Sequence, residues 1–160
     1  MNLQSDILYY AGIGSRITPV GICIKLTALA ARLEKLGFVL RSGGAIGADT
    51  AYEKGVTDGN NKRILKAKHA TSEAIELAST YHPNWTACDG YAKKLHGRNA
   101  MLILGENLDS PVKFVVAWSP ADGVGGTALG ISIAKAKSIP VFNVRDPEKF
   151  HELEKFLITH

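Results

Sequence analysis

Short apolar runs alternate with helical stripes of apolar residues along most of the chain. Residues 7–11 are apolar and lead into the glycine turn of residues 12–16, which predicts a buried strand followed by a tight turn. Thr18 and Pro19 then predict a helix start, as N-cap and first helical residue. The stripe of this helix has spacings of four, three, four and three residues, at Ile22, Leu26, Leu29, Leu33 and Leu36. Gly37 is predicted to end it.

The same alternation continues through the rest of the chain. Further strands are predicted at residues 38–40, 63–67, 113–118 and 140–144. Further helices are predicted at residues 45–54, at 71–80, after a capping box at 86–89, at 127–137, and after 146–147. Because short strands that are apolar on both faces alternate with helices, we expect an α/β fold. The expected architecture is a single domain, residues 1–160, with a doubly wound, mostly parallel five-stranded sheet in the order 3-2-1-4-5 and helices on both faces.

Nine of the 16 glycines fall in the junctions after the first, second and fourth predicted strands. They are Gly12 and Gly14, then Gly43, Gly44 and Gly47, then Gly123, Gly125, Gly126 and Gly130. In the expected strand order these loops meet at one crevice, where backbone amides and helix N-termini favour an anion. Hydroxyl and basic side chains accompany them, namely Ser15, Ser42, Thr127, Arg16 and Arg41. The pattern predicts a phosphate site with amides at 14–15, 43–44 and 126–127; the alternative is that the glycines only make tight turns.

Two common nucleotide-binding motifs are absent from the sequence. No stretch matches the P-loop pattern, in which four residues separate two glycines and Lys and then Ser or Thr follow the second glycine. The first glycine turn begins like a dinucleotide fingerprint, but Ile17 stands where the third glycine belongs. The second predicted strand ends in Arg41-Ser42, where a nicotinamide site needs an acidic residue. These departures argue against a nicotinamide enzyme, and no cofactor is expected.

Three segments resemble the SLOG superfamily of Rossmann-like nucleotide-binding domains. They are residues 12–16 (GIGSR), 41–49 (RSGGAIGAD) and 125–130 (GGTALG). Residues 42–49 resemble the second-strand motif of the DprA family of DNA-processing proteins. Residues 95–101 and 123–130 resemble two motifs of the Lonely Guy family of nucleoside-monophosphate phosphoribohydrolases. The resemblance follows nearly the whole chain and implies a Rossmann-like fold and a homo-oligomer, a dimer or larger, with sites near the interface.

The sequence departs from the Lonely Guy motif at its catalytic glutamate, because Gly130 occupies that position. Cleavage of a glycosidic bond passes through a cationic sugar and needs a negative group nearby. If the protein is an enzyme, Asp49 is therefore the first candidate and Glu53 the second, since they lie four apart on one face of a predicted helix. Asp122, in the loop after the fourth strand, is a third candidate.

Arg98 is a candidate ligand residue because it lies on the apolar stripe of Tyr91, Leu95 and Leu102. An arginine on such a stripe is expected either to reach solvent or to meet an anion. Contact with a phosphate or a ribose of the ligand is the favoured interpretation. Asn99 is expected to share this role. Trp118 ends the fourth predicted strand, where it could stack on a base or pack in the core. His82 and His96 have the side chains for acid–base chemistry, but no sequence pattern places them at the site.

Composition narrows the class of protein. Apolar residues make up 46% and charged residues 21%, as in globular proteins, and there is no apolar run long enough to span a membrane. The net charge is +4, and residues 61–100 carry seven basic and three acidic side chains, which favours an anionic partner there. Cys23 and Cys88 form no CxxC or cysteine–histidine sequence motif, so no metal site is expected. A cytoplasmic location is the expectation.

Three functions remain open. The first is a nucleoside 5′-monophosphate N-glycosidase that releases base and sugar 5-phosphate, with Arg98 supporting the sugar phosphate. The second is a non-catalytic binder or sensor of a nucleotide or another sugar phosphate, which the missing glutamate favours. The third is a DprA-like DNA-binding protein, with nucleic acid as the partner.

Overall fold

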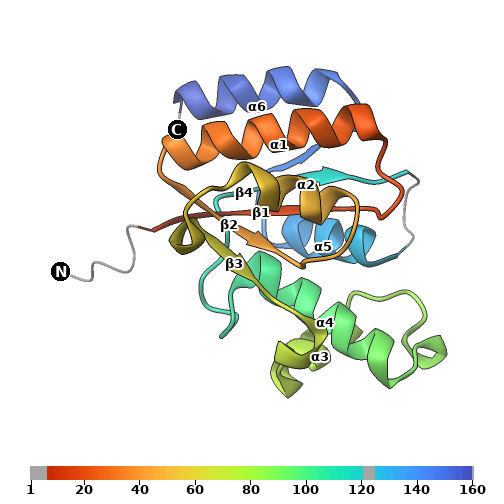
Figure 1. The fold of residues 1–160 in the computed structure, drawn as a ribbon. Helices are drawn as coiled ribbons and strands as arrows, with labels where there is room; N and C mark the ends of the chain where they lie inside the picture. Colours follow the sequence, from red (N-terminus) through yellow and green to blue (C-terminus); the bar gives the residue numbers. More distant parts are fainter. Residues whose placement is uncertain (1–6, 121–124, 160) are drawn as a thin grey trace.

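The computed structural model describes residues 7–120 and 125–159, which form a three-layer α/β/α arrangement (Figure 1). The middle layer is a five-stranded sheet in the order β3-β2-β1-β4-β5. The strands are β1 (Leu8–Gly14), β2 (Phe38–Ser42), β3 (Lys62–Ile64), β4 (Phe114–Trp118) and β5 (Val141–Asn143). Every neighbouring pair is parallel. The predicted Rossmann-like α/β fold and its strand order are confirmed, and the sheet is parallel throughout rather than mostly so.

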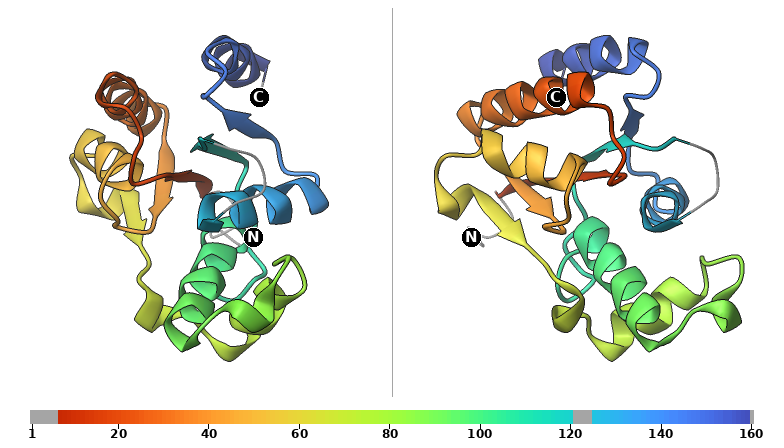
Figure 2. Two further views of the ribbon diagram at one scale, coloured as in Figure 1. Left: turned by 90° about the vertical axis from the view of Figure 1, so that its right-hand side faces the viewer. Right: turned by 45° about the vertical axis from the view of Figure 1, so that its right-hand side comes forward.

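Helices cover both faces of this sheet, as Figures 1 and 2 show. One face is covered by α1 (Val20–Lys35), α2 (Ala48–Gly55) and α6 (Glu148–Thr159). The other is covered by α3 (Ser72–Ser79), α4 (Gly90–Leu104) and α5 (Gly125–Ala136). In the described part of the chain, no helix combines the length and apolarity needed to cross a membrane.

Two hydrophobic cores fill the spaces between the layers. They form because successive side chains of a strand such as β4 point alternately to the two faces of the sheet. Phe114 and Val116 pack toward α1 and α6, whereas Val115 and Ala117 pack toward α4 and α5. All four are fully buried, because successive strand residues point to opposite faces of a sheet covered on both sides. Each large apolar side chain buried in this way stabilises the fold by about 1.5–3 kcal/mol. The sheet is therefore a rigid support for the loops at its carboxyl edge.

Several helix starts differ from the predicted ones. Helix α1 begins at Val20 with Pro19 as N-cap, because the Thr18 hydroxyl donates to the Ser15 carbonyl instead of capping the helix. Helix α2 begins at Ala48 rather than at residue 45, after the left-handed backbone of Gly47. The capping box predicted at 86–89 does not form, because residues 85–87 make a 3₁₀ turn and the Asp89 carboxylate caps α4 alone.

Candidate functional site

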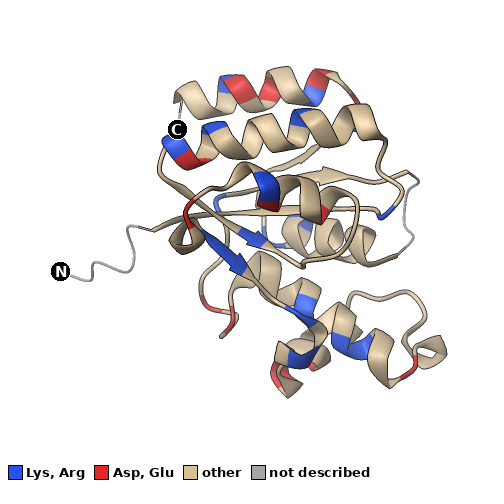
Figure 3. Ribbon diagram, viewed as in Figure 1, with Lys and Arg blue, Asp and Glu red and all other residues tan. Residues whose placement is uncertain are grey.

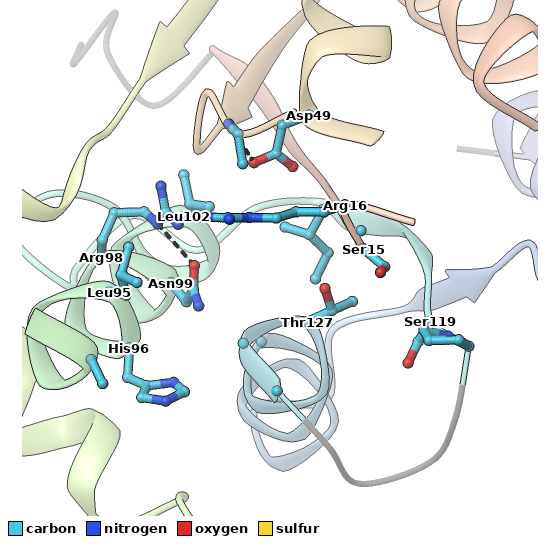
Figure 4. Close-up of a pocket in the computed structure, with 18 residues that line it drawn as sticks. Ser15, Arg16, Asp49, Leu95, His96, Arg98, Asn99, Leu102, Ser119 and Thr127 are labelled. Atoms are coloured by element: carbon cyan, nitrogen blue, oxygen red, sulfur yellow. Dashed lines mark hydrogen bonds between the residues drawn. The ribbon is translucent and has the colours of Figure 1, made fainter. Parts of the chain in front are cut away.

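A pocket of about 550 Å³ lies beyond the carboxyl ends of β1 and β4, and α4 forms its opposite wall (Figure 4). The ends of β1 and β4 and the loops after them contribute Ile13, Gly14, Ser15, Arg16, Ser119 and Pro120, and α5 contributes Gly125, Gly126, Thr127 and Gly130. The loop after β2 and the start of α2 contribute Ala45 and Asp49, and α4 contributes Ala92, Leu95, His96, Arg98, Asn99 and Leu102. Of the predicted phosphate or catalytic residues, nine line this pocket: Gly14, Ser15, Arg16, Asp49, Arg98, Asn99, Gly125, Gly126 and Thr127.

The predicted backbone amides differ in their availability. The N–H of Ser15 donates to the Trp118 carbonyl at 3.2 Å, which extends the pairing of β1 with β4. By contrast, the first turn of a helix has N–H groups without partners inside the helix, and Gly126 and Thr127 form the first turn of α5 in the pocket wall. The amide contribution to an anion site is therefore at the start of α5, where the helix dipole also favours negative charge.

Arg98 lies buried between α4 and the loops after β2 and β3. Its Nη1 donates to the Gly43 carbonyl at 2.7 Å and to the Leu65 carbonyl at 2.9 Å. Its Nε donates to Asn99 Oδ1 at 2.9 Å (Figure 4), and among the described residues none accepts from Nη2. The expectation that this arginine meets solvent or an anion was thus incomplete, since two backbone carbonyls and the Asn99 side chain accept from Nη1 and Nε. Nη2 remains for a ligand in the pocket.

Asp49 is a nearly buried carboxyl group at the start of α2. Its Oδ2 accepts the Ala45 N–H at 3.2 Å, and its side chain is only 6% exposed. Burial raises the pKa of Asp49 from its ordinary value to about 6, although this hydrogen bond and the Arg98 cation both oppose the rise. The carboxyl group thus changes its protonation state close to neutral pH.

Gly43 allows Arg98 and Asp49 to come close to each other. A Cβ atom at this position would overlap Arg98 Nη1 and lie 2.9 Å from Asp49 Oδ2. The neighbouring Gly44 carbonyl accepts from Lys66 Nζ at 3.1 Å. Neither Gly43 nor Gly44 lines the pocket, so the structure does not bring the second predicted pair of amides to it. The glycines after β2 make room for side chains instead.

Four further predicted residues lie away from the pocket. The Ser42 hydroxyl is fully buried and donates to Glu53 Oε2 at 2.6 Å, so these two side chains bind each other. Trp118 packs against the core on the α1 and α6 side. Arg41 stacks over the Tyr9 ring and donates to the carbonyl and the hydroxyl of Ser110. Asp122 and Gly123 lie outside the described residues.

Gly130, at the position where the Lonely Guy motif has its glutamate, lies in the tightly packed contact between α5 and β1. A Cβ atom there would lie 3.0 Å from the Ile13 Cδ1 atom, because α5 packs closely on β1. A carboxylate side chain would have to push this contact apart. In the described residues of the pocket, Asp49 is the carboxyl group that remains.

Lys and Arg residues occur on β3 and α4, and also on α1 and α6, as Figure 3 shows. Several of them already have partners in the protein. Arg63 pairs with Glu106 at 3.0 Å, and Lys62 donates to the carbonyls of Glu53 and Val56. Arg16, at the pocket, is exposed. The excess of basic residues in segment 61–100 therefore overstates the positive charge that is available to a ligand.

One group of residues near the pocket was not predicted from the sequence. His96 lines the pocket, and His82 and Cys88 lie beside it, with one donor atom of each within 4.8 Å of the others. No metal site was expected from the sequence, because Cys23 and Cys88 form no CxxC or cysteine–histidine sequence motif. The 3₁₀ turn before α4 bends the chain back on itself and brings the three side chains together. Tyr91, by contrast, is exposed and does not belong to the buried stripe.

Comparison with known proteins identifies the fold but not the family. No family model matches the chain, and no curated protein sequence matches it. A solved structure of DNA processing protein A from Helicobacter pylori, described for its single-stranded DNA binding mode, is similar. The two share 18% sequence identity and a TM-score of 0.59, over 89% of this chain and 68% of the other. At this identity the likeness shows a DprA-like Rossmann-like fold.

Proposed function

We propose that the protein binds single-stranded DNA and holds one phosphate of the strand in the pocket between β1, α4 and α5. The observation that supports this most is the arrangement of donors, since the first turn of α5 faces Arg98 and Asn99 across the pocket. Amides at a helix start and an arginine suit a phosphate diester. The similar fold of a protein that binds single-stranded DNA supports the choice of ligand.

Arg16 is the side chain best placed to bind the strand without supporting the fold. It is exposed and extends over the pocket from the loop after β1 (Figure 4). We expect Arg16→Ala to weaken binding of a fluorescent oligothymidine about 10- to 150-fold, the effect of one charge-assisted contact. The slope of log affinity against log salt should fall by about 0.7, the value for one phosphate contact on a single strand. Fluorescence anisotropy at several salt concentrations measures both.

Lys35→Ala is the matched control for this experiment. Lys35 is an exposed cation at the end of α1, and this variant changes the net charge equally. Binding by Lys35→Ala should match that of the unmodified protein. Equal losses in both variants would indicate a general charge effect and contradict the pocket as the binding site.

Gly126 should tolerate no side chain if the start of α5 binds phosphate. A Cβ atom there would lie 2.5 Å from Asn99 Nδ2, so a valine must displace the Asn99 amide that holds Arg98 Nε. We expect Gly126→Val to reduce oligothymidine binding below detection in the same anisotropy assay.

The control for Gly126→Val is Gly21→Val, because Gly21 lies on the exposed face of α1, where a Cβ atom would have open space around it. This variant should bind normally. If folded Gly126→Val, with the circular dichroism of the native protein, also binds normally, the start of α5 is not part of the site.

A second candidate function is binding or cleavage of a free nucleoside monophosphate. The pocket volume of about 550 Å³ suits a small ligand, and Asp49 offers a carboxyl group beside it. Nucleoside monophosphates should then compete with the oligonucleotide at low concentration, and an N-glycosidase would release free base. Competition without base release indicates a mononucleotide binder, while binding of the oligonucleotide alone supports the DNA-binding function.

A further inference from the structure

Three side chains that bind metals in other proteins gather at the outer end of α4. Cys88 Sγ lies 3.6 Å from His82 Nε2, and the rings of His82 and His96 lie 4.5 Å apart between centroids. One donor atom of each residue lies within 4.8 Å of the other two. Two imidazoles and one thiol in a single small volume are an unusual arrangement without a ligand, and they come from a stretch of only 15 residues, 82–96.

His96 provides a second, independent observation. The residue is 9% exposed, and its Nδ1 atom is buried without any hydrogen-bond partner among the described residues. A buried polar atom without a partner is costly, by about 1–3 kcal/mol, and therefore rare in native proteins. A ligand that this nitrogen could bind would remove that cost.

We propose that His82, Cys88 and His96 bind a divalent transition metal ion, with Zn²⁺ as the best match. Zn²⁺ prefers imidazole nitrogen and thiolate sulfur, in tetrahedral geometry. With a Zn–S bond of about 2.3 Å and a Zn–N bond of about 2.1 Å, a tetrahedral angle separates the two ligands by about 3.6 Å. The Cys88 and His82 atoms already have this separation. Three protein ligands leave the fourth position to water or to another ligand.

Metal binding requires two local changes. Cys88 must lose its thiol proton, because thiolate is the binding form. His82 Nδ1 accepts the Asn84 N–H at 3.0 Å, so the proton of the neutral ring is on Nε2, facing Cys88. The metal must replace that proton, and the ring must then turn away from Asn84 so that Nδ1 can carry it. Both groups are only half-buried and lie in the loop before α4, where such an adjustment is least costly.

This site adjoins the phosphate site and shares one residue with it. His96 belongs to both, because it lines the pocket and faces His82. The proposal does not depend on DNA binding, and it is tested by metal binding alone.

The test uses untagged full-length protein treated with chelator, so that no added histidines bind metal. In Cys23→Ser, Cys88 is the sole cysteine of the chain. We expect Co²⁺ alone to produce a thiolate-to-metal absorption band in this variant, and Zn²⁺ to abolish it. Calorimetry should give one Zn²⁺ per chain. His82→Ala should weaken binding at least ~30-fold, on the scale of losing a metal-site residue.

His151→Ala is the control for the histidine change, because His151 is exposed on α6, and it should bind Zn²⁺ like the unmodified protein. Absence of the thiolate band in Cys23→Ser would overturn the proposal. A stoichiometry of one Zn²⁺ per two chains would also overturn it, because the ion would then bridge two molecules. Equal Zn²⁺ affinity in His82→Ala would have the same consequence.

Discussion

Replacing Arg98 with alanine is expected to lower the free energy of unfolding by about 3–5 kcal/mol. The guanidinium binds the carbonyls of Gly43 and Leu65 and the Asn99 side chain, so its loss leaves buried acceptors without donors. It also leaves the Asp49 carboxylate without a nearby cation that opposes the effect of burial. Urea unfolding followed by circular dichroism measures the change.

Arg145→Ala is the control for loss of a surface arginine, because Arg145 is exposed after β5 and its removal should change stability by less than about 0.5 kcal/mol. Arg98→Lys should fall between the two, since one ammonium group cannot reach all three acceptors with the geometry of a guanidinium. If Arg98→Ala is as stable as Arg145→Ala, the carbonyls of Gly43 and Leu65 have other donors and the described role of Arg98 is wrong.

Replacing Asp49 with asparagine is expected to stabilise the protein at pH 7–8, by about 3 kcal/mol. The folded protein binds the Asp49 proton with a pKa raised from 3.8 to about 6, and each unit is equivalent to about 1.4 kcal/mol. The stabilisation from the protonated carboxyl is complete below the unfolded pKa and is lost as the pH rises through the folded pKa. Asparagine is uncharged at every pH and keeps an oxygen for the Ala45 N–H. Thermal or urea unfolding between pH 5 and pH 8 measures the difference.

The pH dependence separates this cause from a general effect of charge. The advantage of Asp49→Asn should fall to about half by pH 5. Asp109→Asn removes an exposed carboxylate in the segment before β4 and should give no comparable gain at pH 8. An advantage of Asp49→Asn that is the same at pH 5 and pH 8 would show that ionisation of the buried carboxyl is not its source.

The fold was predictable because its pattern repeats along the chain. Val115 and Val116 are apolar and follow each other in the sequence. Such successive apolar residues are typical of a strand that is covered on both faces. The boundaries were less predictable, because they depend on contacts between distant segments. Thr18 donates to Ser15 instead of capping α1, and Ser15 in turn accepts from Ala48 at the start of α2.

Residues of the candidate site could be predicted from the sequence only if they lie at the ends of strands and helices. Gly126, Thr127 and Arg16 line the pocket because the topology brings the loops after β1 and β4 together. The glycines after β2 had a different cause, because Gly43 makes room for Arg98 from α4, and no local pattern contains that contact. Ser42 and Glu53 could not be separated from the pocket residues by type, since only the three-dimensional packing shows that they bind each other.

The central position of β1 has a consequence for how the molecule assembles. β1 pairs with β2 early in the chain, but its other edge pairs with β4, whose residue Phe114 lies far along the sequence from its partner Tyr10. A nascent chain that ends before β4 can form β1, β2 and β3 while β1 still has an unpaired edge, which is a template for aggregation. The pocket needs α4 and α5 as well, so it is among the last features to form. Ligand capture during synthesis would therefore report that β4 has inserted beside β1 and that the aggregation-prone edge is closed.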